Sequence, residues 1–281
     1  MINHLIIHIL ITFPSSLYLN SINNRNKDVL NYYFKDIIIL GVKKMEISEI
    51  IKDALVYPLN NVKSLIIYVI IGAITGILGG ASLIAMASQV SGNNYVAAGG
   101  FGFIGILVMI IGTLLISGYG LDIVKYGIER REDGPGIDIV RQILNAIKVI
   151  IVSFVYYIIP AIIAWLLYTL LGRGILTVLV VFIIYVVFAF AQFMAICRLA
   201  KYDSLGAALS VSEAIGDIPK IGMLKVLLTV ISVFIIAFII AFIFALVYKV
   251  NNILGGILLG LFGVYATFFY NRAIGLLYSQ V

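Results

Sequence analysis

Charged residues in this 281-residue sequence are separated by long uncharged intervals whose lengths match membrane-spanning helices. Four intervals between consecutive charges contain 24, 24, 23 and 22 residues, and a fifth, between Lys63 and Asp122, contains 58. A helix needs about 20 apolar residues to cross the hydrocarbon core of a bilayer. The longest interval holds two such helices, because residues 91–94 (Ser-Gly-Asn-Asn) favour a turn. The sequence therefore predicts six transmembrane helices, over residues 64–88, 98–121, 149–171, 175–197, 226–248 and 253–273.

Composition excludes the common soluble alternatives. Hydrophobic residues make up 63% of the chain, charged residues 11%, and the mean hydropathy is +1.15. An ordinary soluble domain is about 45–50% apolar and about 25% charged. A soluble globular protein, a disordered chain and a nucleic-acid-binding protein are thereby excluded. A transmembrane β-barrel is unlike this chain as well, because its strands have about 10 residues of alternating polarity. The predicted fold class is an all-α, polytopic helical membrane protein.

Positive charges are distributed unevenly over the two sides of this predicted bundle. Fourteen lysine and arginine residues between Lys43 and Arg272 fall on one side, and only Arg173 and Lys249 fall on the other. An excess of Lys and Arg marks cytoplasmic loops. We therefore expect a cell-membrane protein with both ends of the six-helix core in the cytoplasm. The net charge of +6 then indicates topology and contact with anionic lipid headgroups, with no nucleic-acid partner.

Three segments on the charged side have the periodicity of amphipathic helices. Residues 46–57 and 137–148 place apolar side chains at i, i+3, i+4 and i+7 or close to it, with charged side chains on the other face. Residues 204–217 repeat this pattern more weakly. We predict that each segment forms a helix that lies in the membrane interface.

Each amphipathic segment precedes two predicted spans, which gives three helical hairpins. The hairpins end at Tyr126, Tyr202 and Tyr278, which are 76 residues apart both times. We predict three repeats of an interfacial helix followed by a hairpin, over about residues 45–130, 137–202 and 204–281.

Residues 1–44 lie outside this pattern. Their apolar stretch, Leu5–Phe13, is short, has no basic residue before it and lacks a clear cleavage site, so it is a poor signal peptide. His4 and His8 have helical spacing, but two ligands without a nearby carboxylate or thiol do not make a metal site. We predict that residues 1–44 either precede the true translation start at Met45 or are poorly ordered, and that residues 45–281 form the six-span domain. The intact mass of the natively expressed protein tests this start.

Several stretches of the core resemble a known family. Met45–Ala54, followed by Tyr57-Pro58, resembles the start of an archaeal family of multi-pass membrane proteins known as a domain of unknown function (number 4013). The turn at residues 118–120 and the charged stretch Ile128–Pro135 are similar too. The resemblance covers about residues 45–279 and implies an integral membrane location and an archaeal source. It implies no activity, cofactor or site residue.

Ionisable side chains near the membrane core are the candidate site residues. Asp122, Arg198 and Arg272 lie at the inner ends of the second, fourth and sixth predicted spans, and Gln192 and Asn271 lie nearby. If the repeats pack around a pseudo-axis, we expect these residues to meet at the cytoplasmic mouth and contact an anionic lipid or solute. The alternative is that each charged side chain extends to the interface and only anchors its helix.

Glycine and proline suggest how the spans pack. Gly72, Gly76 and Gly80 share one face of the first span, which favours close packing of helices, with a sliding seam as the alternative. Pro160 falls inside the third span and predicts a kink, with a broken transport helix as the alternative.

No catalytic motif is present in the sequence. HExxH, G-x-S-x-G and Walker motifs are missing, the core has no histidine, and Cys197 is the single cysteine. We therefore predict no catalytic, cofactor-binding or metal-binding residues. The predicted function is non-enzymatic, with the basic interfacial helices binding membrane lipids or a protein partner on the cytoplasmic side. The alternative is a transporter or channel for a small or amphipathic solute, along a path between the repeats that Gln192, Asn271 and Thr113 would line.

Overall fold

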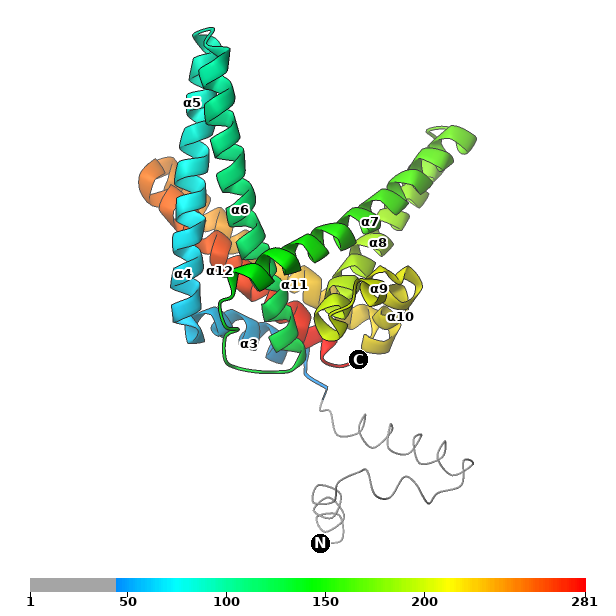
Figure 1. The fold of residues 1–281 in the computed structure, drawn as a ribbon. Helices are drawn as coiled ribbons and strands as arrows, with labels where there is room; N and C mark the ends of the chain where they lie inside the picture. Colours follow the sequence, from blue (N-terminus) through cyan, green and yellow to red (C-terminus); the bar gives the residue numbers. More distant parts are fainter. Residues whose placement is uncertain (1–43) are drawn as a thin grey trace, which may run out of the picture. The chain divides into compact units, whose positions relative to one another are not determined.

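The computed structural model describes residues 44–281, and the chain divides into two units between Lys44 and Met45. The described residues form helices joined by turns, with no strand among them (Figure 1). The all-α fold class is therefore confirmed. The predictions about residues 1–43, including His4 and His8, lie outside the described residues, so the start at Met45 stays a prediction. The elements are α3 (Ile47–Asn60), α4 (Val62–Ile74), η1 (Thr75–Gly79), α5 (Gly80–Ser91), α6 (Tyr95–Ile128), α7 (Ile139–Leu171), α8 (Ile175–Tyr202), α9 (Leu205–Leu209), α10 (Val211–Ile221), α11 (Met223–Val250) and α12 (Asn252–Tyr278).

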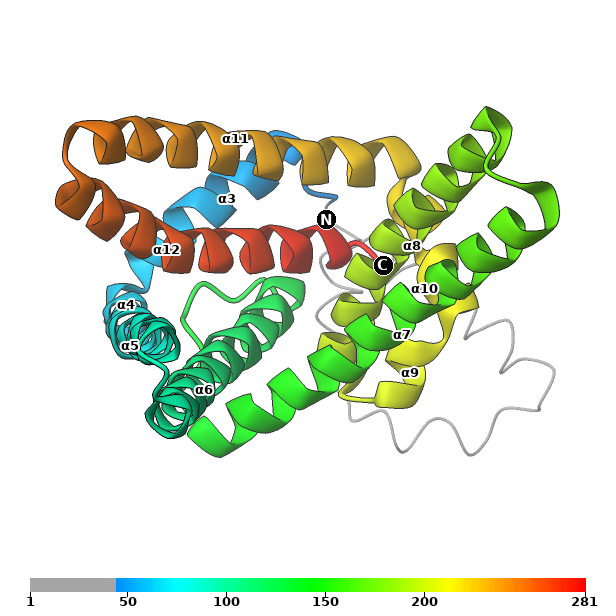
Figure 2. The ribbon, with the colours of Figure 1, turned by 90° about the horizontal axis from the view of Figure 1, so that it is seen from above.

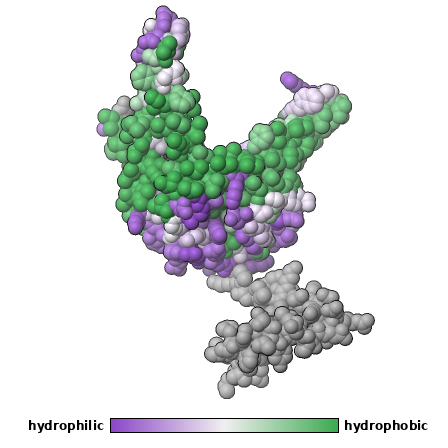
Figure 3. Space-filling model, in the orientation of Figure 1, coloured by the Kyte–Doolittle hydropathy of each residue, from purple (hydrophilic) through white to green (hydrophobic). Residues whose placement is uncertain are grey.

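Six stretches of helix among the described residues are long and apolar enough to cross a membrane, as predicted. The first combines α4, η1 and α5, and the others are α6, α7, α8, α11 and α12. Hydrophobic residues cover these helices, and hydrophilic residues gather at the end that carries α3, α9 and α10 (Figure 3). We call this end the charged side.

The second predicted interfacial helix is wrong as a separate element. Residues 139–148 are the first turns of α7, which continues through Pro160 to Leu171. The physical reason is that no glycine or proline interrupts the chain between Ile139 and Pro160. The first repeat does break, after Pro58 at Asn61, and the third breaks at Gly222, whose φ of 111° favours glycine.

The predicted glycine face of the first span is also wrong in part. A Cβ atom on Gly72 would lie 3.1 Å from Val264, but Cβ atoms on Gly76 and Gly80 would meet nothing within 4 Å. The packed residue is instead Gly79, where a Cβ would lie 2.6 Å from the side chain of Met109 on α6. The reason is η1, a π-helical turn that shifts the face presented to α6 and that sequence periodicity does not predict.

Helix α12 lies at the centre of the described unit. It contacts α3, α4, α6, α8 and α11, and Figure 2 shows it between α11 and α6. Every residue from Arg272 to Tyr278 is buried. The charged end of α12 is therefore the place where the three helix pairs are held together.

Candidate functional site

Arg272 is the most deeply buried of the predicted site residues. Its side chain is 1% exposed, and its Nε and Nη2 atoms donate to the Asp53 carboxylate of α3 at 2.7 and 3.2 Å. Nη1 donates to the backbone carbonyls of Tyr126, at 3.3 Å, and Arg131. The guanidinium also lies over the Tyr57 ring, 4.6 Å from its centroid. Every nitrogen of the guanidinium has an acceptor within the protein, so Arg272 is a structural residue.

Arg198 near the end of α8 is bound in the same manner. Nη1 donates to Asp217 of α10 at 2.9 Å, Nη2 donates to Glu213, and Nε donates to the carbonyl of Ala207 at 2.8 Å. Its side chain is 9% exposed. Arg198 is therefore occupied as well and offers no nitrogen to a ligand.

Asp122 of α6 accepts hydrogen bonds from the beginning of α7. Asn145 donates to Oδ1 at 2.9 Å, and the Nε and Nη2 atoms of Arg141 lie 3.3 and 3.2 Å from Oδ2. Asp122, Arg198 and Arg272 thus each bind a different partner, and no hydrogen bond or ion pair joins any two of them in the part of the chain that the structure describes. Each of these three residues lies near the end of a hairpin and forms an ion pair with a different helix. Asp122 of α6 pairs with the start of α7, Arg198 of α8 pairs with α10, and Arg272 of α12 pairs with α3.

Asp217 of α10 is a buried carboxylate that binds three neighbouring side chains. It accepts hydrogen bonds from Lys220 at 2.7 Å and from the Tyr278 hydroxyl at 2.7 Å, in addition to Arg198. Burial acts to raise the pKa of Asp217, but these hydrogen bonds outweigh it, and the pKa lies below its ordinary value.

The lowered pKa of Asp217 predicts acid-sensitive stability. Its contribution is complete above the unfolded pKa of about 3.9 and is lost as the pH falls through the lower folded pKa. We expect the unfolding temperature of the detergent-solubilised protein to fall below about pH 4. Asp217→Asn should lower that temperature near neutral pH and remove part of the acid dependence. Thermal scans between about pH 3 and 8 measure both effects. Glu132→Gln, at an exposed carboxylate, is the control, and a wild-type acid profile in Asp217→Asn would contradict the prediction.

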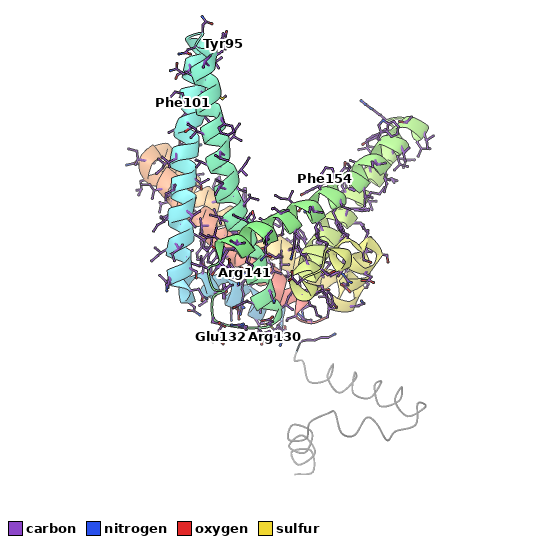
Figure 4. All side chains as sticks on the ribbon, viewed as in Figure 1. Tyr95, Phe101, Arg130, Glu132, Arg141 and Phe154 are labelled. Carbon is purple, nitrogen blue, oxygen red and sulfur yellow. The ribbon has the colours of Figure 1, made fainter. Side chains whose placement is uncertain are left out.

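A cavity of about 380 Å³ lies between α6, α7 and α8 on the charged side. Asp122 is the predicted site residue that lines it, and Figure 4 shows Arg141 at the start of α7, where α7 meets α6. Leu121, Leu144 and Leu199 form apolar parts of its wall. The charged residues around it are Asp122, Lys125, Asp138, Arg141, Lys148 and Asp203.

Each carboxylate of this charged cavity has at least one bond within the protein. Asp122 binds Arg141 and Asn145, and Asp203 pairs with Lys148 at 2.6 Å. Asp138 accepts the backbone N–H of Arg141 at 3.0 Å and so caps α7. Lys125 is exposed and has no ion-pair partner among residues 44–281, and no described residue accepts from Nη1 of Arg141. Lys125 and Nη1 of Arg141 are therefore the free cationic donors of the cavity.

Comparison with known proteins places this architecture in a family. The model of a protein family described as "Protein of unknown function (DUF4013)" matches residues 101–248, just over half of the chain. The chain belongs to the DUF4013 family. No curated protein and no solved structure matches it. The match is shorter than the expected resemblance over residues 45–279, and the archaeal source stays a prediction.

The charged cavity lies wholly within the part of the chain that DUF4013 matches, from Leu121 to Asp203. Asp53 and Arg272 lie outside it. Because the function of DUF4013 is unknown, the family assigns no role to these residues, and any role must come from their geometry.

The polar residues predicted to line a transport path share none of the three cavities described for residues 44–281. Asn271 lines a mainly apolar groove beside α12, while Gln192 lines a third cavity, of about 250 Å³, with Tyr156 and Pro160. The Gln192 amide donates to the Ser153 hydroxyl at 3.0 Å. Thr113 is exposed on α6 and lines none of these three cavities. These three cavities do not join the predicted set into one polar path.

Sequence reasoning missed Lys125 and Lys148 as site residues and treated Arg141 only as part of an amphipathic face. A signal was present, because Arg141, Asn145 and Lys148 lie at i, i+4 and i+7 of one predicted helix. The missing information was that this helix packs on the end of α6. Within residues 44–281, no group of three or more His, Cys, Asp or Glu side chains could hold a metal ion.

Proposed function

We propose that this DUF4013 protein is a non-enzymatic integral membrane protein that binds the phosphate headgroup of a membrane lipid in the charged cavity. The observation that carries the proposal is the pair of unoccupied cationic donors, Lys125 and Nη1 of Arg141, beside carboxylates that are already bonded. Lysine and arginine form charge-assisted hydrogen bonds with phosphate oxygens. An anionic group is therefore the ligand chemistry that these donors favour, although the cavity carries equal numbers of acidic and basic residues.

The position of the cavity supports a lipid as the source of that phosphate. Its residues lie at the charged-side ends of α6, α7 and α8. Toward that side, the hydrophobic surface of the molecule gives way to a hydrophilic one (Figure 3). Phospholipid headgroups occupy the same level of a bilayer, and anionic lipids attract lysine and arginine there. The excess of positive charge on this side favours a cytoplasmic orientation of the cavity and of both ends of residues 45–281.

Lys125→Gln tests this function. The variant removes a free cation from the cavity without breaking an ion pair, so we expect the protein to fold and to retain phosphatidylglycerol about tenfold more weakly, as for the loss of one charge-assisted hydrogen bond. Native mass spectrometry of delipidated protein, titrated with phosphatidylglycerol in detergent, measures the retention.

Lys52→Gln is the matched control, because Lys52 is also exposed on the charged side but lies on α3, outside the cavity. Its retention should equal that of the wild type. Equal losses in the two variants would mean that surface charge alone attracts lipid, and unchanged retention in Lys125→Gln would mean that the cavity binds no phosphate. Either result overturns the proposal.

A further inference from the structure

A second cavity lies farther along the helices from the charged side and differs in chemistry from the charged cavity. It is a groove of about 470 Å³ whose walls come from α6, α7, α8, α11 and α12. Its lining is mostly apolar, with Val233 and Phe234 from α11 and Phe269 and Tyr270 from α12. Ligand pockets usually measure about 300–1,000 Å³, and both cavities fall within that range.

The groove and the charged cavity meet at Leu121, which lines both. On α6 the shared face runs from Ser117 in the groove through Leu121 to Lys125 in the charged cavity. Residues four apart lie above one another on a helix, so these three form one continuous stripe.

The same transition occurs on the two other helices. On α7 the stripe runs from Val149 in the groove to Asn145 and Arg141 in the charged cavity. On α8 it runs from Ile196 in the groove through Ala200 to Asp203, which follows α8, in the charged cavity. On each of three helices, residues that line the groove are therefore followed by residues that line the charged cavity.

Two polar groups of the groove are bonded within their own helix. The Thr267 hydroxyl donates to the carbonyl of Gly263 at 2.9 Å, and the Asn271 amide donates to the carbonyl of Thr267 at 2.7 Å. Such bonds reduce what these side chains offer to a polar solute. The groove is therefore better suited to a hydrocarbon chain than to a hydrated molecule.

The geometry points to an occupant that is charged at one end and apolar along its length. Resting on the function proposed above, we propose that the groove takes an acyl chain of the same phospholipid whose headgroup lies in the charged cavity. The ligand is then an intact membrane phospholipid held between α6, α7 and α8, and not a free phosphate or a headgroup at the surface.

Ala237→Phe tests the chain site, because Ala237 lines the groove on α11 and a phenyl ring there would occupy part of it. Each buried methylene changes affinity about fourfold, so excluding two should weaken retention of long-chain phosphatidylglycerol by about tenfold or more. Binding of glycerol phosphate, which has no chain, should not change. Ala161→Phe, at an exposed position of α7, is the control and should retain the lipid as the wild type does. Native mass spectrometry in detergent gives all three values.

The outcomes separate the two proposals. If Lys125→Gln weakens lipid retention but Ala237→Phe does not, the headgroup site stands and the chain site is overturned. If neither the long-chain lipid nor glycerol phosphate binds, both the chain site and the proposed function are overturned. Should Ala237→Phe not fold, phosphatidylglycerol carrying a photoreactive diazirine in its chain is used with the wild-type protein. Saturable labelling within residues 233–237 and 266–270 supports the chain site, and labelling confined to exposed surfaces overturns it.

Discussion

Replacing Arg272 with glutamine is expected to cost more stability than any other single charge removal considered for this protein. The variant leaves the Asp53 carboxylate without its buried partner and leaves the carbonyls of Tyr126 and Arg131 without their donor. It also removes the guanidinium from the face of Tyr57. Removing one member of a buried ion pair costs about 3–5 kcal/mol, and because Asp53 is 33% exposed we expect the lower part of this range. That is a large part of the about 5–15 kcal/mol by which native proteins are usually stable.

The expected result is a strong fall in the yield of monodisperse protein and in its unfolding temperature in detergent. Arg173→Gln is the matched control, since it removes the same charge at an exposed position between α7 and α8. Asp53→Asn completes a double-mutant cycle, in which the two changes together should cost less than the sum of the single changes. Additive costs, or an Arg272→Gln protein as stable as Arg173→Gln, would show that the pair does not hold α12 to α3.

This pair matters because of the chain segments that it joins. Asp53 lies on the first described helix and Arg272 on the last, 219 residues away. The same guanidinium binds the carbonyls of Tyr126, in the last turn of α6, and of Arg131, just after α6. The pairs of Asp122 with Arg141 and of Arg198 with Asp217 join consecutive parts of the chain. Of the three predicted site residues, only Arg272 binds a helix from the beginning of the described chain, α3.

Charge spacing was sufficient to predict the six spans. Burying a charged residue in the hydrocarbon core is costly, so consecutive charges bracket each crossing closely. The predicted span 175–197 lies within α8, and 226–248 lies within α11. The helices extend beyond these spans because the limit of the hydrocarbon core does not end a helix. Only a cap or a breaking residue does, as at Gly222 after α10.

The partners of the charged residues could not be predicted in the same way. The sequence places Asp122, Arg198 and Arg272 at equivalent depths, which suggested one shared cluster. Their partners depend on which helix packs beside each of them, and that is a property of tertiary contact. The sign differs as well, because Asp122 is acidic where Arg198 and Arg272 are basic. The Asp122 carboxylate pairs with Arg141, and Lys125, which lines the same cavity, has no ion-pair partner among the described residues.

Gly118→Ala is the second change for which we expect a large effect. Gly118 of α6 packs directly on the backbone of α7, where an added Cβ would overlap the carbonyl of Gln142 and lie 2.8 Å from its Cα atom. Backbone cannot move aside as a flexible side chain does, so α6 and α7 must separate. Overpacking of a close contact usually costs about 1–3 kcal/mol, and we expect the upper part of this range.

The separation would also disturb the charged cavity, because Asp122 lies one turn after Gly118 and Asn145 lies one turn after Gln142 on α7. We expect Gly118→Ala to lower the unfolding temperature in detergent and to weaken phosphatidylglycerol retention together. Gly100→Ala is a strict control, since Gly100 lies on the same helix and a Cβ there would meet nothing within 4 Å. Replacing glycine with alanine inside a helix is stabilising by about 0.5–1 kcal/mol where there is room, so the two variants should move in opposite directions. A Gly118→Ala protein as stable as Gly100→Ala would show that α6 and α7 do not approach this closely, and the crevice between them would then need a different geometry.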